Sequence, residues 1–407
     1  MPRLLQLDSC LGRGSTGRIA ETIGHLASQR GWDCYMAHGS RYVGESAMQS
    51  HQVGGMGDEY LHYAKSMLFD AHGLGSIHAT KKFVAWMEQI DPDVVHLHNI
   101  HGYWMNYEVL FEYLYKKNIP VVWTFHDCWA ITGHCAMFTS DYCDKWKAQC
   151  SNCPHLDWYP KSLFVDRSEK HFNMKKKLFA SYPNLTIVSV SNWLDGIVRE
   201  SFLKDKTHIV IPNGVDTDVF SPQDEAVGRV REQYGLKDKI VIISVADKWH
   251  EGIGLSDVSK LRVILDDRFV VMLVGVTQAQ KDNLPDGVIG VLHTNSRKEL
   301  AELYSMADIS FTPQTVATFG LVTAESMACG TPAIVYAAAA AAEVIDNHGF
   351  VVPARDIDTL VQTLNLFVSE GGKRKYGQGC RNHILGHYEE KRNYSRYVDL
   401  YESLIKL

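Results

Sequence analysis

Residues 317–335 read ATFGLVTAESMACGTPAIV. A tight turn at Gly320 opens a short helix from about Thr323, the Gly-Thr-Pro sequence at 330–332 ends that helix, and residues 333–335 form a buried strand. The N-terminus of such a helix offers unpaired N–H groups and a partial positive charge, which suits a phosphate group. The stretch therefore predicts a helix and a strand of an α/β sheet beside an anion-binding turn.

The same alternation of apolar strands and helical periods extends outward along the chain. Strands are expected at 4–7, 94–98, 121–125 and 187–190, and again at 240–245, 269–274, 288–292, 309–312 and 333–335. Strands that alternate with helices predict parallel, doubly wound sheets.

A cluster of turn residues, IPNGVD at 211–216, interrupts this rhythm near the middle of the chain. The 407 residues also exceed the length at which a single core usually divides into domains. We therefore expect an α/β protein with two Rossmann-like domains, residues 1–212 and 213–390, that face each other across a cleft. Ligands of such sheets bind beyond the carboxyl ends of the strands, so this cleft is the expected active site.

The composition argues against several classes of protein. A net charge of −6 is unlike a nucleic-acid binder, which normally carries a basic domain. No stretch of the sequence approaches the roughly 18 apolar residues of a membrane span, and Asp8 comes too early for a signal peptide. We expect a cytoplasmic protein that acts on small molecules and binds no nucleic acid.

Histidines and glycines are expected where strands end. His126 follows the strand 121–125, where a neutral imidazole can both donate and accept a hydrogen bond, and His98 and His101 lie in a similar loop. The loop after the first strand contains Gly14, Ser15, Thr16 and Gly17. Glycine there lets the backbone approach a ligand closely. Packing and turn formation are the structural alternatives for these residues.

Taken together, these segments resemble glycosyltransferase family 4. The resemblance rests on the stretch 317–335, the linker 211–216 with Phe220 and Pro222, the glycine-rich loop after the first strand, and SVSNWL at 189–194. It implies the GT-B fold, a nucleotide-diphosphate sugar donor bound by the second domain and an acceptor bound by the first. It also implies retention of anomeric configuration, no catalytic metal, and a final helix, about 391–407, that packs back on the first domain.

The resemblance implies roles for individual residues as well. His126 would contact the donor sugar near the reacting centre and Glu325 would accept hydrogen bonds from the ribose, so both are candidate catalytic residues. The donor-binding candidates are Gly320, Leu321, Val322, Glu325, Lys248, His293 and Thr294. The candidates for contact with the acceptor and the leaving phosphate are Gly14, Ser15, Thr16, Gly17, His98 and His101. The structural alternative for Glu325 is that it complements the dipole of its helix.

Three departures from the family pattern lie on the donor side. Family members carry an Arg-Lys pair before Gly-Leu in the loop after the first strand of the second domain. Here the segment 249–255 reads WHEGIGL, so Gly252 and Ile253 align with that pair. The first glutamate of the family signature falls on Ala317, and alanine fills Ala337 to Ala342 in place of a loop rich in Gly, Pro and Ser.

Cations on a departing diphosphate stabilise the transition state of a metal-free transferase, so the missing pair predicts weak donor binding, with Lys248 as a partial substitute. The leading hypothesis is a transferase that moves a sugar from a nucleotide-diphosphate sugar to a bacterial surface glycan or its lipid-linked precursor. One alternative is a catalytically silent relative that binds glycan or partner enzymes. A nucleotide-sugar epimerase of the same architecture is the other.

Four cysteines are crowded into one segment of the first domain. Cys135, Cys143, Cys150 and Cys153 have the spacing C-x7-C-x6-C-x2-C. Thiolates at such spacing suit tetrahedral zinc, so a structural zinc that holds a long loop is one hypothesis. Unliganded thiols and an oxidised disulfide are the alternatives.

A basic and aromatic stretch follows the cysteines. Its members are Lys161, Phe164, Arg167, Lys170, Phe172, Lys175, Lys176, Lys177, Leu178 and Phe179. Such a stretch can lie on an anionic membrane surface, so peripheral contact with the cytoplasmic face of the inner membrane is one hypothesis. A solvated helix face is the alternative.

Overall fold

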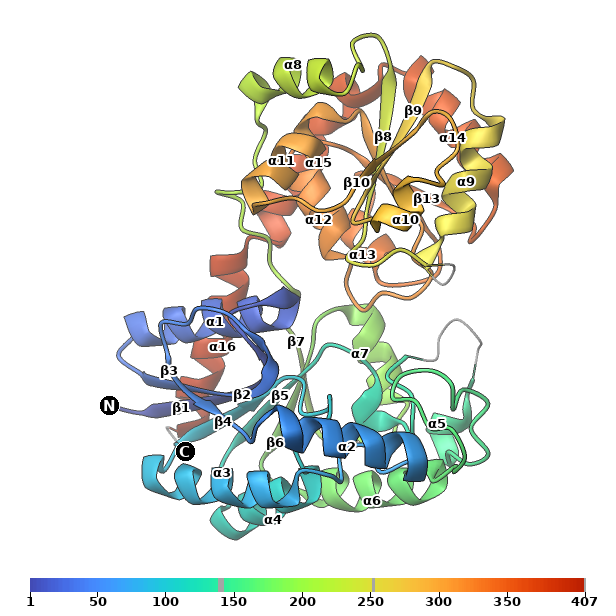
Figure 1. The fold of residues 1–407 in the computed structure, drawn as a ribbon. Helices are drawn as coiled ribbons and strands as arrows, with labels where there is room; N and C mark the ends of the chain where they lie inside the picture. The colour runs from blue at the N-terminus through green and yellow to red at the C-terminus, as the bar shows by residue number, and fades with distance from the viewer. Residues whose placement is uncertain (138–142, 251–252, 406–407) are drawn as a thin grey trace. The chain divides into compact units, whose positions relative to one another are not determined.

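The structure is a computed structural model that describes residues 1–137, 143–250 and 253–405. The chain forms two compact units, Met1–Ile211 with Tyr394–Leu407, and Pro212–Asn393 (Figure 1). Each unit is built on one parallel sheet. Helix α16 (Glu390–Ile405) starts in the second unit and ends in the first.

Among the described residues, the first unit forms a seven-stranded sheet in the order β3-β2-β1-β4-β5-β6-β7. Its strands are β1 (Arg3–Leu11), β2 (Asp33–Val43), β3 (Gln49–Gln52), β4 (Val94–Leu97), β5 (Val121–Phe125), β6 (Leu185–Ser189) and β7 (Thr207–Val210). Its helices are α1 (Gly14–Gln29), α2 (Met56–Phe69), α3 (Ile77–Ile90), α4 (Tyr107–Lys117), α5 (Lys145–Ala148), α6 (Ser168–Ser181) and α7 (Asn192–Arg199). A single 3-10 turn occupies Trp129–Ile131.

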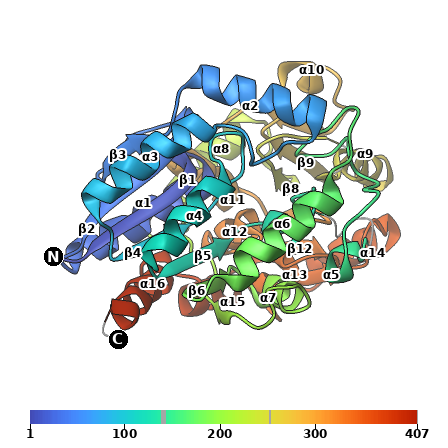
Figure 2. The same cartoon turned by 90° about the horizontal axis from the view of Figure 1, so that it is seen from below.

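Helices cover both faces of this sheet, so its central strands are continuous apolar runs. On one face, Ile23 of α1 and Tyr397 and Tyr401 of α16 pack with Leu4 of β1 and Val122 of β5. Helices α3, α4 and α6 lie on the other side of the sheet from α1 (Figures 1 and 2). The C-terminal helix is thereby part of the core of the first unit.

The second unit forms a six-stranded sheet among the described residues, in the order β10-β9-β8-β11-β12-β13. Its strands are β8 (Ile240–Val245), β9 (Phe269–Val274), β10 (Val288–Val291), β11 (Ile309–Thr312), β12 (Ala333–Tyr336) and β13 (Phe350–Val352). Its helices are α8 (Asp224–Gln233), α9 (Leu255–Ile264), α10 (Gln278–Lys281), α11 (Arg297–Met306), α12 (Leu321–Ala328), α13 (Ala341–Ile345), α14 (Ile357–Ser369) and α15 (Gly372–His387).

The expected pair of doubly wound parallel sheets is confirmed. The strand order of each sheet reverses at a switch point, which lies between β1 and β4 in the first unit and between β8 and β11 in the second. Ligands of such folds bind at the loops beyond the carboxyl ends of the strands at these points. The cleft expected between the two domains stays a prediction.

Candidate active site

The loops that follow β1 and β4 meet at the switch point of the first unit. The Thr16 hydroxyl hydrogen-bonds the buried carboxyl of Asp8, and Asn99 Nδ2 donates to Thr16 Oγ1 at 3.5 Å. Burial raises the pKa of Asp8 to about 6. These contacts hold the start of α1 against the end of β4.

The expectation that residues 14–17 form a loop is wrong. Helix α1 begins at Gly14, so these residues are its first turn, where the backbone N–H groups have no partner within the helix. Gly14 and Ser15 are exposed, whereas Gly17 is buried against Cys10. The segment thus offers N–H donors from a helix terminus.

His98 and His126 lie side by side at the ends of β4 and β5. Their rings are 15° from parallel, and His98 Nδ1 is 3.0 Å from His126 Nε2. His98 Nε2 is 3.1 Å from Oε1 of Gln6, whose amide Nε2 donates to the carbonyl oxygen of Ala20. Since an amide oxygen only accepts, His98 Nε2 carries the proton, His98 Nδ1 accepts and His126 Nε2 donates. Nδ1 of His126 is therefore the unprotonated nitrogen of its ring.

Burial keeps both of these histidines neutral. It lowers the pKa of His126 to about 4, and it lowers the pKa of His98 well below the usual value, helped by the neighbouring His96 and His126. A neutral His126 fits the tautomer that the hydrogen bonds select. It can accept a hydrogen bond through Nδ1 at neutral pH.

Asp127, His101 and Tyr159 form a second polar chain beside the histidine pair. His101 Nε2 is 2.7 Å from Asp127 Oδ2, and His101 Nδ1 is 2.9 Å from the Tyr159 hydroxyl. Burial alone would raise the pKa of Asp127, but its interactions with His101, the backbone N–H of Trp129 and His126 together lower that pKa. Asp127 also accepts the backbone N–H of Trp129, as an aspartate that caps a turn does.

One pocket of the first unit collects these groups. It is lined by His98, Asn99, His101, His126 and Asp127, together with residues of β5. The sequence pattern did not single out Gln6, Asp8, Asn99 or Tyr159. Gln6 and Asp8 were detectable, because polar residues within an apolar strand are unusual unless they bind something at its end.

The predicted donor turn lies at the switch point of the second unit. Gly320 has φ 108° and precedes α12, which begins at Leu321, two residues earlier than expected. Glu325 is therefore in the second turn of α12 rather than the first, where a charge would complement the helix dipole most. Leu321 and Val322 are half-buried in the first turn, and the Thr323 and Thr312 hydroxyls, 3.0 Å apart, tie α12 to β11.

The loop after β8 approaches this turn. A Cβ atom on Gly254 would lie 2.5 Å from Cβ of Pro313, so only glycine allows the loop after β8 to pack on the loop after β11. Lys248 is exposed just after β8, and Ile253 is half-buried against the apolar core of the unit. Gly252 lies outside the described residues. His293 and Thr294 lie between β10 and α11, with His293 exposed.

The alanine segment packs against the same turn. The Ala340 N–H donates to the carbonyl oxygen of Ala317 at 3.1 Å, and a Cβ atom on Gly320 would lie 3.0 Å from Cβ of Ala341. The segment is only partly helical, because residues 337–340 form turns and α13 begins at Ala341. Two of the three departures from the family pattern are thus in direct contact.

The structure does not support the expected zinc site. Cys135, Cys143, Cys150 and Cys153 line one small cavity, and the thiols of Cys135 and Cys153 interact, which lowers the pKa of Cys153 to about 7. Zinc bonds of about 2.3 Å would bring four sulfurs to within roughly 3.8 Å of one another. Within the described residues, these thiols form no group of three with ligand atoms inside 4.8 Å. All nine cysteines are described, and each is a free thiol.

The basic stretch is only partly exposed, and its contact with a membrane stays a hypothesis. Phe172, Lys175 and Phe179 share one face of α6, and that face is buried, with Lys175 Nζ bonded to the carbonyl oxygens of Trp129 and Thr132. The exposed members are Lys161, Phe164, Lys170, Lys176 and Lys177. Across the described part of the chain, no helix has the length and hydropathy needed to cross a bilayer.

Two family models match the chain. The model of the family described as Glycosyltransferase Family 4 matches residues 16–219, half of the chain, and that described as Glycosyl transferases group 1 matches residues 229–378. Both switch-point loops of the first unit fall in or beside the first match. The α12 turn falls in the second.

Curated relatives extend over most of the chain. The putative colanic acid biosynthesis glycosyl transferase WcaC of Escherichia coli K12 is 25% identical over 364 residues, which is 85% of this chain and 86% of the relative. The MMP alpha-(1->4)-mannosyltransferase of Mycolicibacterium hassiacum is 30% identical over 264 residues, which is 61% of this chain and 60% of the relative.

Solved structures match over the full length. Sucrose-phosphate synthase from Thermosynechococcus elongatus has a TM-score of 0.74 at 16% identity and covers 100% of both chains. HepE from Anabaena in complex with UDP-glucose has a TM-score of 0.67 at 12% identity and covers 98% of this chain and 99% of the other. These likenesses establish the GT-B fold. The chain is a glycosyltransferase and belongs to glycosyltransferase family 4.

Proposed function

We propose that the chain transfers a sugar from a nucleotide-diphosphate sugar to a glycan or lipid-linked glycan of a bacterial surface polysaccharide, with retention of anomeric configuration. The turn at Gly320 carries this proposal, because it aims the N-terminus of α12 at the switch point where the loops after β8 and β11 touch. The similarity to a colanic acid transferase and the UDP-glucose complex of HepE support it.

The second unit would hold the donor. N–H groups of the first turn of α12, at Leu321 and Val322, would bind the diphosphate, and Glu325 would accept hydrogen bonds from the ribose. Lys248, an exposed residue of the loop after β8, would supply a cation in place of the usual Arg-Lys pair. The backbone at His293 and Thr294 would contact the base.

The first unit would hold the acceptor and the reacting sugar. Nδ1 of His126 accepts a hydrogen bond from a hydroxyl of the donor sugar, and its partner His98 fixes the ring. His101, oriented by Asp127 and Tyr159, would contact the acceptor hydroxyl. The first turn of α1, Gly14 to Gly17, would present N–H groups to the leaving phosphate.

Helix α2 supports an acceptor attached to a lipid. Its polarity is the reverse of that of most surface helices, because the polar residues Glu59, His62 and Ser66 are buried. The apolar residues Leu61, Leu68 and Phe69 are exposed. Two of these buried side chains have partners within the first unit, since Glu59 pairs with Arg41, and His62 Nε2 accepts two backbone N–H groups. An apolar helix face of this kind suits the interfacial zone of a bilayer. We propose that this face contacts the cytoplasmic surface of the inner membrane.

Vesicle co-sedimentation tests the membrane contact. Replacing Leu61, Leu68 and Phe69 by glutamine should reduce binding to vesicles of phosphatidylcholine and phosphatidylglycerol, while Val263→Gln with Ile264→Gln, on exposed positions of α9, should not. Equal binding of both variants would remove the membrane role of α2.

A thermal-shift panel of UDP-, GDP- and ADP-sugars tests the function itself, because a donor that binds the native state stabilises it. We expect one nucleotide class to raise the melting temperature. NMR of the product should then show the anomeric configuration of the donor. A silent relative would respond to no donor, and an epimerase would convert the donor without an acceptor.

A further inference from the structure

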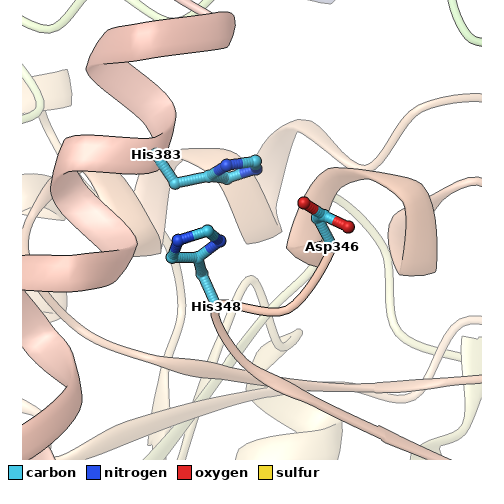
Figure 3. A group of neighbouring side chains, drawn as sticks. All are labelled: Asp346, His348 and His383. Atoms are coloured by element: carbon cyan, nitrogen blue, oxygen red, sulfur yellow. The ribbon is translucent and has the colours of Figure 1, made fainter.

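Two histidines and an aspartate of the second unit converge on one spot at the C-terminal end of α13. Asp346 ends α13, His348 lies in the turn before β13, and His383 projects from α15 (Figure 3). One ligand atom of each lies within 4.8 Å of the other two, and no other three His, Cys, Asp or Glu side chains of the described residues do so. The two rings lie one above the other, with the carboxylate beside them.

The hydrogen bond of His383 prepares its ring for a cation. His383 Nε2 is 3.0 Å from the carbonyl oxygen of Val344, which only accepts, so Nε2 carries the proton. In the neutral ring Nδ1 then carries a lone pair. Metal-binding histidines usually have their second nitrogen fixed in this way by a carbonyl or carboxylate oxygen.

Both histidines have a buried nitrogen that is not satisfied. Nδ1 of His348 and Nδ1 of His383 are shielded from solvent and have no hydrogen-bond partner among the described residues. The His348 ring lies against Gly379, one turn before His383 on α15, with its Cδ2 atom 3.9 Å from where a Cβ would be. Buried polar atoms without partners are rare and destabilising, so a group that satisfied both would stabilise the fold.

Asp346 completes the cluster from the solvent side. It is exposed, and its φ of 48° is in the left-handed region that side-chain-bearing residues seldom adopt. This conformation holds the carboxylate beside the rings. An ion could therefore reach the two nitrogens from solvent and meet a negative charge there.

We propose that Asp346, His348 and His383 bind a divalent transition-metal ion through the two Nδ1 atoms and a carboxylate oxygen. Two imidazoles and one carboxylate suit Zn²⁺ and its neighbours, whereas Mg²⁺ and Ca²⁺ prefer oxygen ligands. Zn–N bonds of about 2.0–2.1 Å place two ligand nitrogens roughly 3.3 Å apart. The rings, now stacked with centroids 4.4 Å apart and 14° from parallel, turn toward the ion when it binds. The ion links the turn after α13 to α15. It thereby fixes α13, whose residue Ala341 lies against Gly320.

Titration with Co²⁺ in a reducing buffer tests this site, because cobalt bound to nitrogen and oxygen absorbs in the visible range without the strong near-ultraviolet band of thiolate ligation. We expect one equivalent with nitrogen and oxygen ligation in the full chain, displaced by Zn²⁺. His348→Gln and Asp346→Asn should each weaken it at least tenfold. These two variants spare the buried hydrogen bond of His383.

The matched control is His25→Gln, which removes an exposed imidazole from the first unit and should bind cobalt as the unaltered chain does. Melting curves without metal establish that all variants are folded, and added Zn²⁺ should raise the melting temperature of the unaltered chain and of His25→Gln only. The proposal is overturned if the unaltered chain binds no cobalt with this spectrum. It is also overturned if His348→Gln and Asp346→Asn retain full affinity.

Discussion

The backbone N–H of Ala340 donates a hydrogen bond to the carbonyl oxygen of Ala317, 3.1 Å away. Ala341, the next residue, lies against Gly320, which opens the proposed donor turn. Two departures from the family pattern that are more than twenty residues apart in the sequence are therefore one packed contact. Small side chains fit there because the two segments approach so closely.

This contact predicts that the alanine segment tolerates larger residues at its exposed end only. Ala341→Val should lower the free energy of unfolding by about 1–3 kcal/mol, because added methyl groups meet Gly320 in a buried site. Ala337→Val, at an exposed position of the same segment, should leave it nearly unchanged. Urea denaturation measures both, and equal stability of the two variants would contradict the packing argument.

His126 should matter for turnover more than for stability. His126→Ala would remove the proposed hydrogen bond to the reacting sugar and should lower kcat about a hundredfold or more. His25→Ala, at an exposed position of α1, is the control. Steady-state kinetics with the identified donor measure the effect. Unchanged kcat in a folded His126→Ala protein would remove the catalytic assignment.

Restoring the family cations should strengthen donor binding. The double change Gly252→Arg with Ile253→Lys should tighten affinity tenfold or more, since one charge-assisted hydrogen bond contributes roughly 1.5–3 kcal/mol. Calorimetric titration at fixed salt compares the two forms. Equal affinity would mean that Lys248 already supplies the charge. In that case Lys248→Ala should weaken donor binding, whereas Lys260→Ala, at an exposed position of α9, should not.

The stability difference between the wild type and Asp8→Asn should depend on pH. Its pKa in the folded chain is about 6, above the usual 3.8, so the folded state binds the proton more tightly and wild-type stability falls as pH rises through this range. Asp8→Asn resembles the protonated form. The free energy of unfolding of Asp8→Asn relative to that of the wild type should therefore increase between about pH 4 and pH 6, by up to about 3 kcal/mol. Above about pH 6 the difference should stay constant. Urea denaturation at several pH values measures this difference, and a constant difference would contradict the burial argument.

The sequence predicted the parts of the molecule that depend on local pattern. Apolar strands that alternate with helical periods predicted both sheets, and the tight turn at Gly320 predicted helix α12. The start of α12 was placed two residues late, because the left-handed glycine sets the first helical residue and periodicity does not.

The parts that depend on long-range contacts were not predictable in this way. The buried face of α6 looked basic and exposed, because Lys175 finds carbonyl partners from a loop more than forty residues earlier. The four cysteines shared a metal-like spacing, but spacing does not fix the distances between sulfurs. The link from His126 through His98 to Gln6 joins three strands, so no single segment reveals it.

The proposed function requires the second unit to bind a nucleotide-diphosphate sugar at the α12 turn. Calorimetric titration with the donor chosen by the thermal-shift panel tests this binding. It compares the unaltered chain with Glu325→Gln and with Glu225→Gln, a control at an exposed position of α8. We expect one donor site per chain, with an affinity that is at least tenfold weaker in Glu325→Gln and unchanged in Glu225→Gln. Equal affinity in Glu325→Gln, or no heat with any donor in the unaltered chain, would contradict it.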